Sequence, residues 1–341
     1  MKTVAELPGS SAHSGELDQE QQRTSPSRRT PAAAGAGDGE ARHERTSSSG
    51  TEQAFALARD GTKLFVRSRS EGQPGNATRA ILCDGIACDG FIWKYLWDDL
   101  APVAPVTHWH YRGHGRSAAP ADPDRIDIAA HADDLTRVRL FVGDPPCVLI
   151  GHSMGCQVVL ENYRQNPEGV RGLVLLCGSF GKVTETFHGV PVLQWVLPKL
   201  LDAVLKRPNV ARAIWTRIPS DVALRMALRW GEIDPERIQP EDMMPYLRHM
   251  THVDLPMFLR MLRAAGEHSA EDLLPEVNVP VLVVAGERDS FTPPFLAERM
   301  AREMPNAELL MVRGGTHVTP IEQAPLVDGR IREFFETRVA R

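Results

Sequence analysis

Short apolar runs alternate with amphipathic stretches along most of the chain after residue 53. Each run holds four or five residues and is rich in Val, Ile and Leu, which is typical of a buried strand. The predicted strands cover residues 80–83, 106–109, 147–150, 173–177, 281–285 and 308–312. Helical spacing of apolar residues predicts helices over residues 91–100, 126–142, 154–165, 294–303 and 325–337. Strands that alternate with helices predict an α/β fold with a mostly parallel β-sheet flanked by helices.

The first part of the chain has a different pattern. Residues 1–53 are rich in Ser, Gly, Ala, Glu, Arg and Thr and have almost no aromatic or branched apolar side chains. Such a segment buries too little surface to offset its ordering entropy, so we expect a disordered N-terminal tail. Residues 54–58 and 63–67 then flank an Asp60-Gly61 turn, which predicts a β-hairpin.

A second departure lies between the fourth and fifth predicted strands. Residues 181–270 have helical apolar spacing, several Trp and Met residues and no clear strand. A segment of this length is not a loop, so we expect an inserted α-helical cap or lid. Residues 54–180 and 271–341 would then form the core of the fold.

Composition excludes several classes of function. A net charge of −5, with 42% hydrophobic and 24% charged residues, is typical of a globular protein that has no electrostatic attraction for nucleic acid. The five cysteines show no CxxC spacing, so we expect them to be reduced. No signal-peptide pattern and no apolar stretch of about 18 residues occurs, so we expect no membrane span and a cytoplasmic location.

One motif carries candidate chemistry. Gly151-His152-Ser153-Met154-Gly155 follows a predicted strand and precedes a predicted helix, which is the setting of a G-x-S-x-G nucleophile elbow. The sharp turn strains the serine backbone, and the two glycines leave room where side chains would collide with neighbouring main chain. We therefore expect the Ser153 hydroxyl to be exposed at the carboxyl edge of the sheet, with His152 pointing away.

The chain resembles the α/β-hydrolase fold superfamily over roughly residues 54 to 337, as a serine-nucleophile esterase or lipase-like member with a helical cap. Three further segments are similar to that family in the expected order. They are HYRGHGRS at 110–117, GERDSFTP at 286–293 and GGTHVTPIEQ at 314–323. The resemblance implies an acyl-transfer site on the core.

A serine hydroxyl needs a base to take its proton and a third group to orient that base. The resemblance places the base at His317, in the loop after the last strand, and His110 and His114 in a structural turn. It places the acid at Asp289, ahead of its neighbours Glu287 and Arg288. In some relatives the acid follows the strand after the elbow, but no aspartate occurs there before Glu185.

An oxyanion hole needs two main-chain amides directed at the reacting carbonyl oxygen. The resemblance assigns them to Met154 and to Ile86, in the loop after the strand at 80–83. Relatives usually carry His-Gly in that loop, whereas this chain has Asp84-Gly85. We expect Asp84 to brace the loop by hydrogen bonds to nearby main-chain amides.

Serine at the elbow argues against epoxide hydrolases and haloalkane dehalogenases, which place aspartate there. We expect hydrolysis of an ester of a small-molecule acyl substrate, with no metal and no cofactor, because cofactor motifs are lacking. Thioester, lactone or amide hydrolysis, acyl transfer and carbon–carbon bond hydrolysis stay open on the same triad, as does a non-catalytic binding protein of this fold. The oligomeric state stays open as well.

The predicted cap gives the only indication of substrate. Its Trp, Met and Leu content exceeds what a small helical layer needs for its own packing, which favours an apolar acyl or alkyl group. Trp195 and Trp230 are the candidate substrate-binding residues. The alternative is that both tryptophans only pack the core of the cap.

Overall fold

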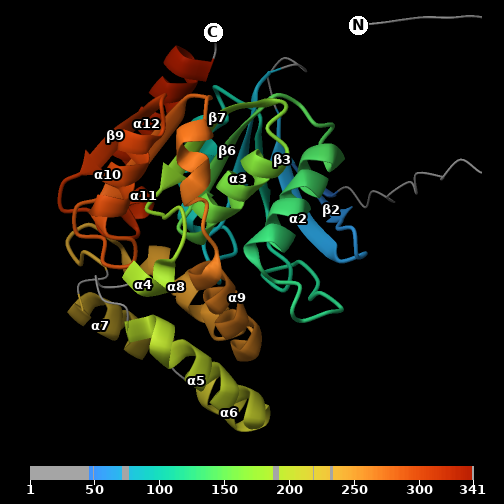
Figure 1. Ribbon diagram of the computed structural model, residues 1–341, viewed down its shortest axis with the longest axis vertical. Coiled ribbons are helices and arrows are strands. Elements are labelled where there is room, and N and C mark those ends of the chain that lie inside the picture. The colour runs from blue at the N-terminus through green and yellow to red at the C-terminus, as the bar shows by residue number, and fades with distance from the viewer. Residues whose placement is uncertain are drawn as a thin grey trace, which may run out of the picture. The chain divides into compact units, whose positions relative to one another are not determined.

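The structure is a computed structural model, and it describes residues 46–48, 50–70, 77–186, 192–217, 219–230 and 233–339. Its described strands form one nine-stranded sheet in the order β1-β2-β3-β5-β4-β6-β7-β8-β9 (Figure 1). The strands are β1 (Thr46–Ser48), β2 (Thr51–Leu57), β3 (Lys63–Arg69), β4 (Arg79–Cys83), β5 (Val106–Trp109), β6 (Cys147–His152), β7 (Val170–Leu176), β8 (Val281–Gly286) and β9 (Ala307–Val312).

The sheet is mostly parallel, as the sequence predicts. Strands β4 to β9 pair in parallel, whereas β1, β2 and β3 pair antiparallel and β3 runs antiparallel to β5. Because both faces of the parallel strands are covered, every residue of β6 and β8 is buried. The carboxyl ends of β6, β8 and β9 therefore meet at one edge of the sheet.

Helices cover the two faces of the sheet and pack on two separate apolar clusters. One cluster contains Leu135 of α2 and Val158 of α3, and the other contains Leu96 of α1 and Ile331 of α12. The core helices are η1 (Phe91–Trp93), α1 (Leu96–Leu100), α2 (Ile128–Phe141), α3 (Met154–Gln165), η3 (Glu271–Glu276), α10 (Pro294–Glu303), α11 (Thr319–Glu322), α12 (Ala324–Phe334) and η4 (Phe335–Val339).

The N-terminal strands begin earlier than the sequence predicts. Gln53 pairs with Thr46 and with Arg67, so residues 46–48 and 51–53 lie in strands although they fall within the predicted tail. Sequence pattern missed them because β2 starts with polar residues that are not fully buried, so no apolar alternation marks its start. Residues 1–45, the rest of the predicted tail, lie outside the described residues.

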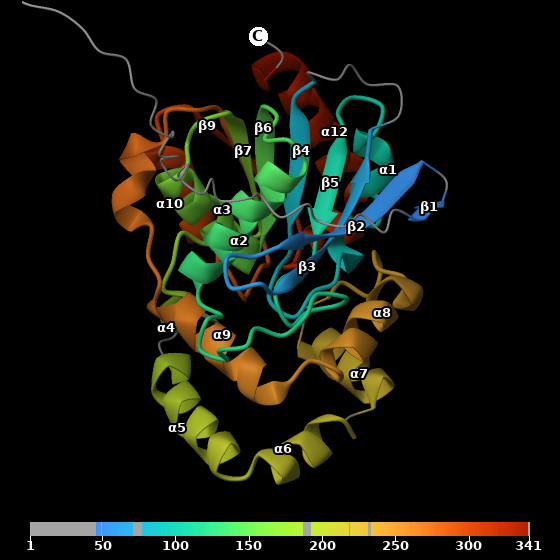
Figure 2. The same ribbon diagram turned by 90° about the vertical axis from the view of Figure 1, so that its right-hand side faces the viewer.

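Between β7 and β8 the described residues form helices (Figure 2). They are α4 (Val183–Thr186), α5 (Val192–Lys206), α6 (Pro208–Trp215), α7 (Ser220–Trp230), α8 (Pro240–Met250) and α9 (Leu255–Glu267). Helix α8 contacts the core because the buried Asp242 accepts hydrogen bonds from Lys94 and from the Tyr95 hydroxyl. In the described part of the chain no helix combines the length and apolarity needed to cross a membrane.

Candidate active site

Ser153 stands in the tight turn that joins β6 to α3. Its φ and ψ angles are 54° and −119°, a conformation that side-chain-bearing residues rarely adopt. A Cβ at Gly151 would overlap the main chain of Gly155, and a Cβ at Gly155 would overlap the carbonyl oxygen of Cys83. The two glycines of the motif are therefore required by the close approach of β6, α3 and the loop after β4.

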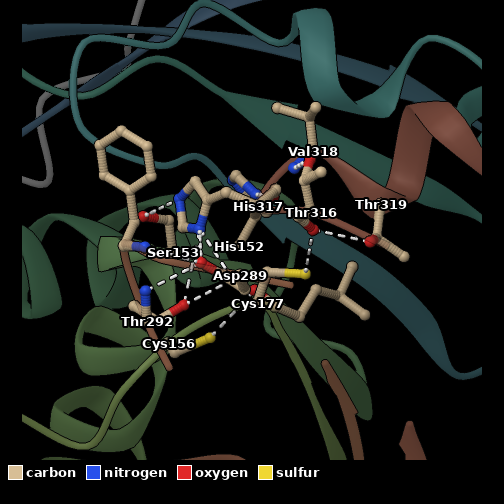
Figure 3. Close-up of polar contacts among 12 residues, drawn as sticks. His152, Ser153, Cys156, Cys177, Asp289, Thr292, Thr316, His317, Val318 and Thr319 are labelled. Carbon is tan, nitrogen blue, oxygen red and sulfur yellow. Dashed lines mark hydrogen bonds and ion pairs between the residues drawn. The ribbon is translucent and has the colours of Figure 1, made fainter. Parts of the chain in front are cut away.

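Loops from two other strands bring His317 and Asp289 to Ser153 (Figure 3). The Nε2 atom of His317 lies 2.9 Å from Ser153 Oγ, and its Nδ1 atom lies 3.0 Å from Asp289 Oδ2. His317 follows β9 and Asp289 follows β8, so three strand ends supply the three side chains. The residues that the resemblance singled out are thus hydrogen-bonded to one another in series.

Asp289 is buried and held by its own turn. Its Oδ1 atom accepts hydrogen bonds from the main-chain amides of Phe291 at 3.0 Å and Thr292 at 2.9 Å. The hydroxyl of Thr292 donates to Oδ2 at 2.8 Å. These donors fix the carboxylate orientation toward the His317 ring.

Two main-chain amides beside Ser153 are free to bind an oxygen atom. Within the described part of the chain, the amides of Ile86 and Met154 donate no hydrogen bond. Gly85 is close to Ser153, because a Cβ built on it would lie 3.1 Å from Ser153 Cβ. Both amides lack a partner in this described part of the structure, and their role as oxyanion donors stays a prediction.

Asp84 braces the loop after β4, but through side chains and not through the main-chain amides that the sequence suggests. Its Oδ1 accepts from Trp93 Nε1 at 2.7 Å, and its Oδ2 lies 2.9 Å from His108 Nε2. Arg67 donates to His108 Nδ1, so His108 carries its proton on Nε2 and donates to Asp84. Burial raises the pKa of Asp84 to about 6 and lowers the pKa of His108 well below its usual value.

Sequence reasoning missed two residues that hold the His317 loop. His152 does not point away, because its Nε2 lies 3.0 Å from the His317 carbonyl oxygen. Glu322 accepts from the amide and the hydroxyl of Thr316 at 3.0 and 2.8 Å, and from the amide of Asp234 at 2.7 Å. Glu322 thus joins the residue before His317 to the segment between α7 and α8. Only its place five residues after His317 could have suggested this role.

The two tryptophans of the predicted cap do not gain support as substrate contacts. Trp195 lies on α5 with 68% of its area exposed, so its contact with an enclosed acyl group stays a prediction. The side chain of Trp230 lies outside the described part of the chain. Phe291, which the sequence analysis did not single out, places its ring centroid 5.0 Å from that of His317.

Comparison with known proteins assigns the family. Residues 81–324 match the model of the alpha/beta hydrolase fold family, and the chain belongs to that family. The fold, its order of strands and the series of side chains at their ends agree with this assignment. The protein is therefore an enzyme of the α/β-hydrolase class.

Three known proteins illustrate the similarity. The chain is 28% identical over 252 residues to the pimeloyl-[acyl-carrier protein] methyl ester esterase of Neisseria meningitidis serogroup B, covering 71% of this chain and 88% of that protein. It is 26% identical over 264 residues to the polyketide synthase ThaQ of Burkholderia thailandensis, covering 77% of this chain but only 12% of ThaQ. An esterase structure from Exiguobacterium antarcticum has a TM-score of 0.65 at 20% identity, covering 83% of this chain and 99% of that one, and shows the fold alone.

Proposed function

We propose that the protein is a serine esterase that cleaves esters of small, apolar acyl groups through an acyl-enzyme intermediate on Ser153. The observation that carries the proposal is the hydrogen-bonded series from Ser153 Oγ through His317 to Asp289, at 2.9 and 3.0 Å. A neutral imidazole at this distance can take the hydroxyl proton, and the buried carboxylate stabilises the imidazolium that forms.

In the first half of the reaction, Ser153 Oγ attacks the ester carbonyl carbon while its proton passes to His317 Nε2. The carbonyl oxygen gains negative charge and accepts hydrogen bonds from the amides of Ile86 and Met154. When the tetrahedral intermediate collapses, His317 gives the proton to the leaving alkoxide oxygen. An alcohol departs, and the acyl group stays on Ser153.

In the second half, water attacks the acyl carbon and His317 takes a proton from it. The same two amides stabilise the second oxyanion, and Ser153 Oγ leaves with the proton held by His317. A carboxylic acid is released, and the free enzyme returns to its starting protonation state. His317 thus acts as base and then as acid in each half.

Two observations support an apolar acyl group. Ile86 carries one of the oxyanion amides and packs its side chain on the apolar core cluster that includes Met154, Met257 and Met261. Phe291 lies against the ring of His317. The name of the Neisseria relative, a methyl ester esterase, supports cleavage of an ester with a small alcohol part.

The proposal is tested with p-nitrophenyl esters from acetate to octanoate. Each buried methylene contributes about 0.8 kcal/mol, so kcat/KM should rise roughly threefold to fourfold per carbon until the pocket is full. Ser153→Ala should lose activity on every ester. A flat series with Ser153-dependent activity would reject the apolar acyl group, and activity that survives Ser153→Ala would reject the serine mechanism.

A further inference from the structure

Helices α5, α6 and α7 carry an unusual share of the exposed apolar surface. Seven of the thirteen large apolar side chains that are exposed in the described part of the chain lie on these three helices. Among them are Trp195 at 68%, Ile214 at 65% and Val210 at 55% exposure. In Figures 1 and 2, α9 lies between the sheet and the pair α5 and α6, so these two helices form the outer layer.

Helix α6 is attached to its neighbours through one face and exposes apolar side chains on another. None of its described residues is buried. Trp215 attaches it to the neighbouring helices, because its Nε1 donates to the Met250 carbonyl at 3.0 Å and its ring stacks on Phe258. Val210 and Ile214 lie one turn apart on a different face of α6 from Trp215. Arg207 immediately precedes the helix, and Arg217 follows it by two residues, so exposed arginines flank the two apolar side chains in the sequence.

The charge of these helices is opposite to that of the whole chain. Residues 192–230 contain seven Lys or Arg residues and two aspartates, a net charge of +5 in a chain of net charge −5. Both aspartates are already paired, Asp202 with Lys206 and Asp221 with Arg225. All seven basic residues are exposed, and one of them, Arg212, also pairs with Asp254 just before α9. The excess positive charge therefore faces solvent beside the apolar side chains.

We propose that the outer face of α5, α6 and α7 docks on an anionic lipid surface. An interfacial site of this kind combines Trp and aliphatic side chains that enter the headgroup region with Lys and Arg that meet lipid phosphates and carboxylates. A symmetric contact with a second copy would bring like charges together. A bilayer accepts apolar side chains dispersed over three helices because its surface has no fixed shape. A protein partner would need a surface whose shape is complementary to these helices.

This docking is independent of the proposed esterase function, and binding can be measured without any turnover. The full chain is mixed with phosphatidylcholine vesicles, with and without phosphatidylserine, and the bound fraction is separated by flotation. We expect binding to the anionic vesicles, weaker binding to the neutral ones, and a decline with added salt.

Variants locate the surface. Val210→Ser and Ile214→Ser should each weaken binding by roughly tenfold, and Arg207→Ala and Arg217→Ala by roughly fivefold each. Phe295→Ser, which removes an exposed apolar side chain of α10, and Lys63→Ala on β3 should leave binding unchanged. Unchanged melting temperatures show that the variants are folded, and hydrolysis of p-nitrophenyl acetate reports separately on the catalytic site.

Three results would overturn the proposal. The first is failure of the wild-type chain to bind anionic vesicles. The second is binding that the α6 variants and the two control variants change equally. The third is a stable dimer, or a complex with an acidic protein, that depends on Val210 and Ile214 while vesicles are not bound.

Discussion

The Nε2 atom of His152 lies 3.0 Å from the main-chain oxygen of His317, so the residue before Ser153 is hydrogen-bonded to the main chain of His317. Burial, together with the nearby His317, lowers the pKa of His152 to about 3. The ring is therefore neutral near pH 7, and its Nε2–H donates the hydrogen bond. The elbow and the loop after β9 are joined by this bond as well as by the bond between the Ser153 and His317 side chains.

Glu322 holds the same loop from its other side, and Glu322→Gln should weaken that hold. The glutamine presents an NH₂ group where the carboxylate accepts from amide and hydroxyl donors of Thr316 and Asp234. We expect the free energy of unfolding to fall by about 1–3 kcal/mol and kcat to fall by roughly tenfold or more through misplacement of His317. Denaturant unfolding and steady-state kinetics on a short ester measure both.

The matched control for this prediction is Glu336→Gln, which changes an exposed glutamate in η4. It should leave kcat and stability unchanged. If Glu322→Gln loses stability but keeps the wild-type kcat, the carboxylate supports the fold without positioning His317.

The stabilities of Ser153 variants should reveal the backbone strain at position 153. Its φ of 54° is unfavourable for any residue with a Cβ. The free energy of unfolding of Ser153→Gly should therefore exceed that of Ser153→Ala by about 1 kcal/mol. Both variants should lose at least about a thousandfold in kcat. Equal stabilities of the two variants in denaturant titrations would argue against strain at the elbow.

Asp84→Ala tests the brace of the oxyanion loop. The change leaves Trp93 Nε1 and His108 Nε2 as buried donors without their acceptor. We expect the free energy of unfolding to fall by about 2–6 kcal/mol, because each of the two unsatisfied donors costs about 1–3 kcal/mol. Asp122→Ala, at an exposed position, serves as control. A loss below that of the control would mean that Asp84 does not brace the loop.

His131 should make the fold less stable in acid. Burial, with His114 and Arg112 nearby, lowers the pKa of His131 well below its usual value. As the pH falls below about 6.5, the unfolded chain gains a proton that the folded chain does not, so stability declines. His131→Leu removes this effect, and its stability relative to wild type should rise by about 1.4 kcal/mol per pH unit below pH 6.5. If the curves of unfolding free energy against pH are parallel for wild type and His131→Leu, the pKa of His131 is not lowered in the folded chain.

Local sequence pattern was sufficient for much of the fold and for the elbow motif around Ser153, whereas the family resemblance supplied His317 and Asp289 as candidates. The apolar runs that end at Ile150 and Ala285 lie in the buried strands β6 and β8, and Ser153 and Asp289 follow the ends of these strands. Gly151 and Gly155 mark the elbow because close main-chain contacts exclude any side chain there. Such features depend on short segments, so a single sequence contains them.

Contacts between distant segments could not be predicted in the same way. Glu322 meets Asp234 across 88 positions, and His108 meets Asp84 between two neighbouring strands. No periodicity encodes these pairs, since each depends on the packing of whole elements. The exposure of Trp195 could not be predicted either. An apolar residue on an amphipathic helix is expected to be buried, and whether it is depends on which elements pack against that helix.

Covalent labelling tests most directly whether Ser153 is the nucleophile. The wild-type chain is incubated with a serine-directed alkyl phosphonate, and its intact mass and peptide masses are then measured. We expect one phosphonyl group per chain, on the peptide that contains Ser153, and no mass gain in Ser153→Ala. A label on any other residue, or equal labelling of Ser153→Ala, would contradict this expectation.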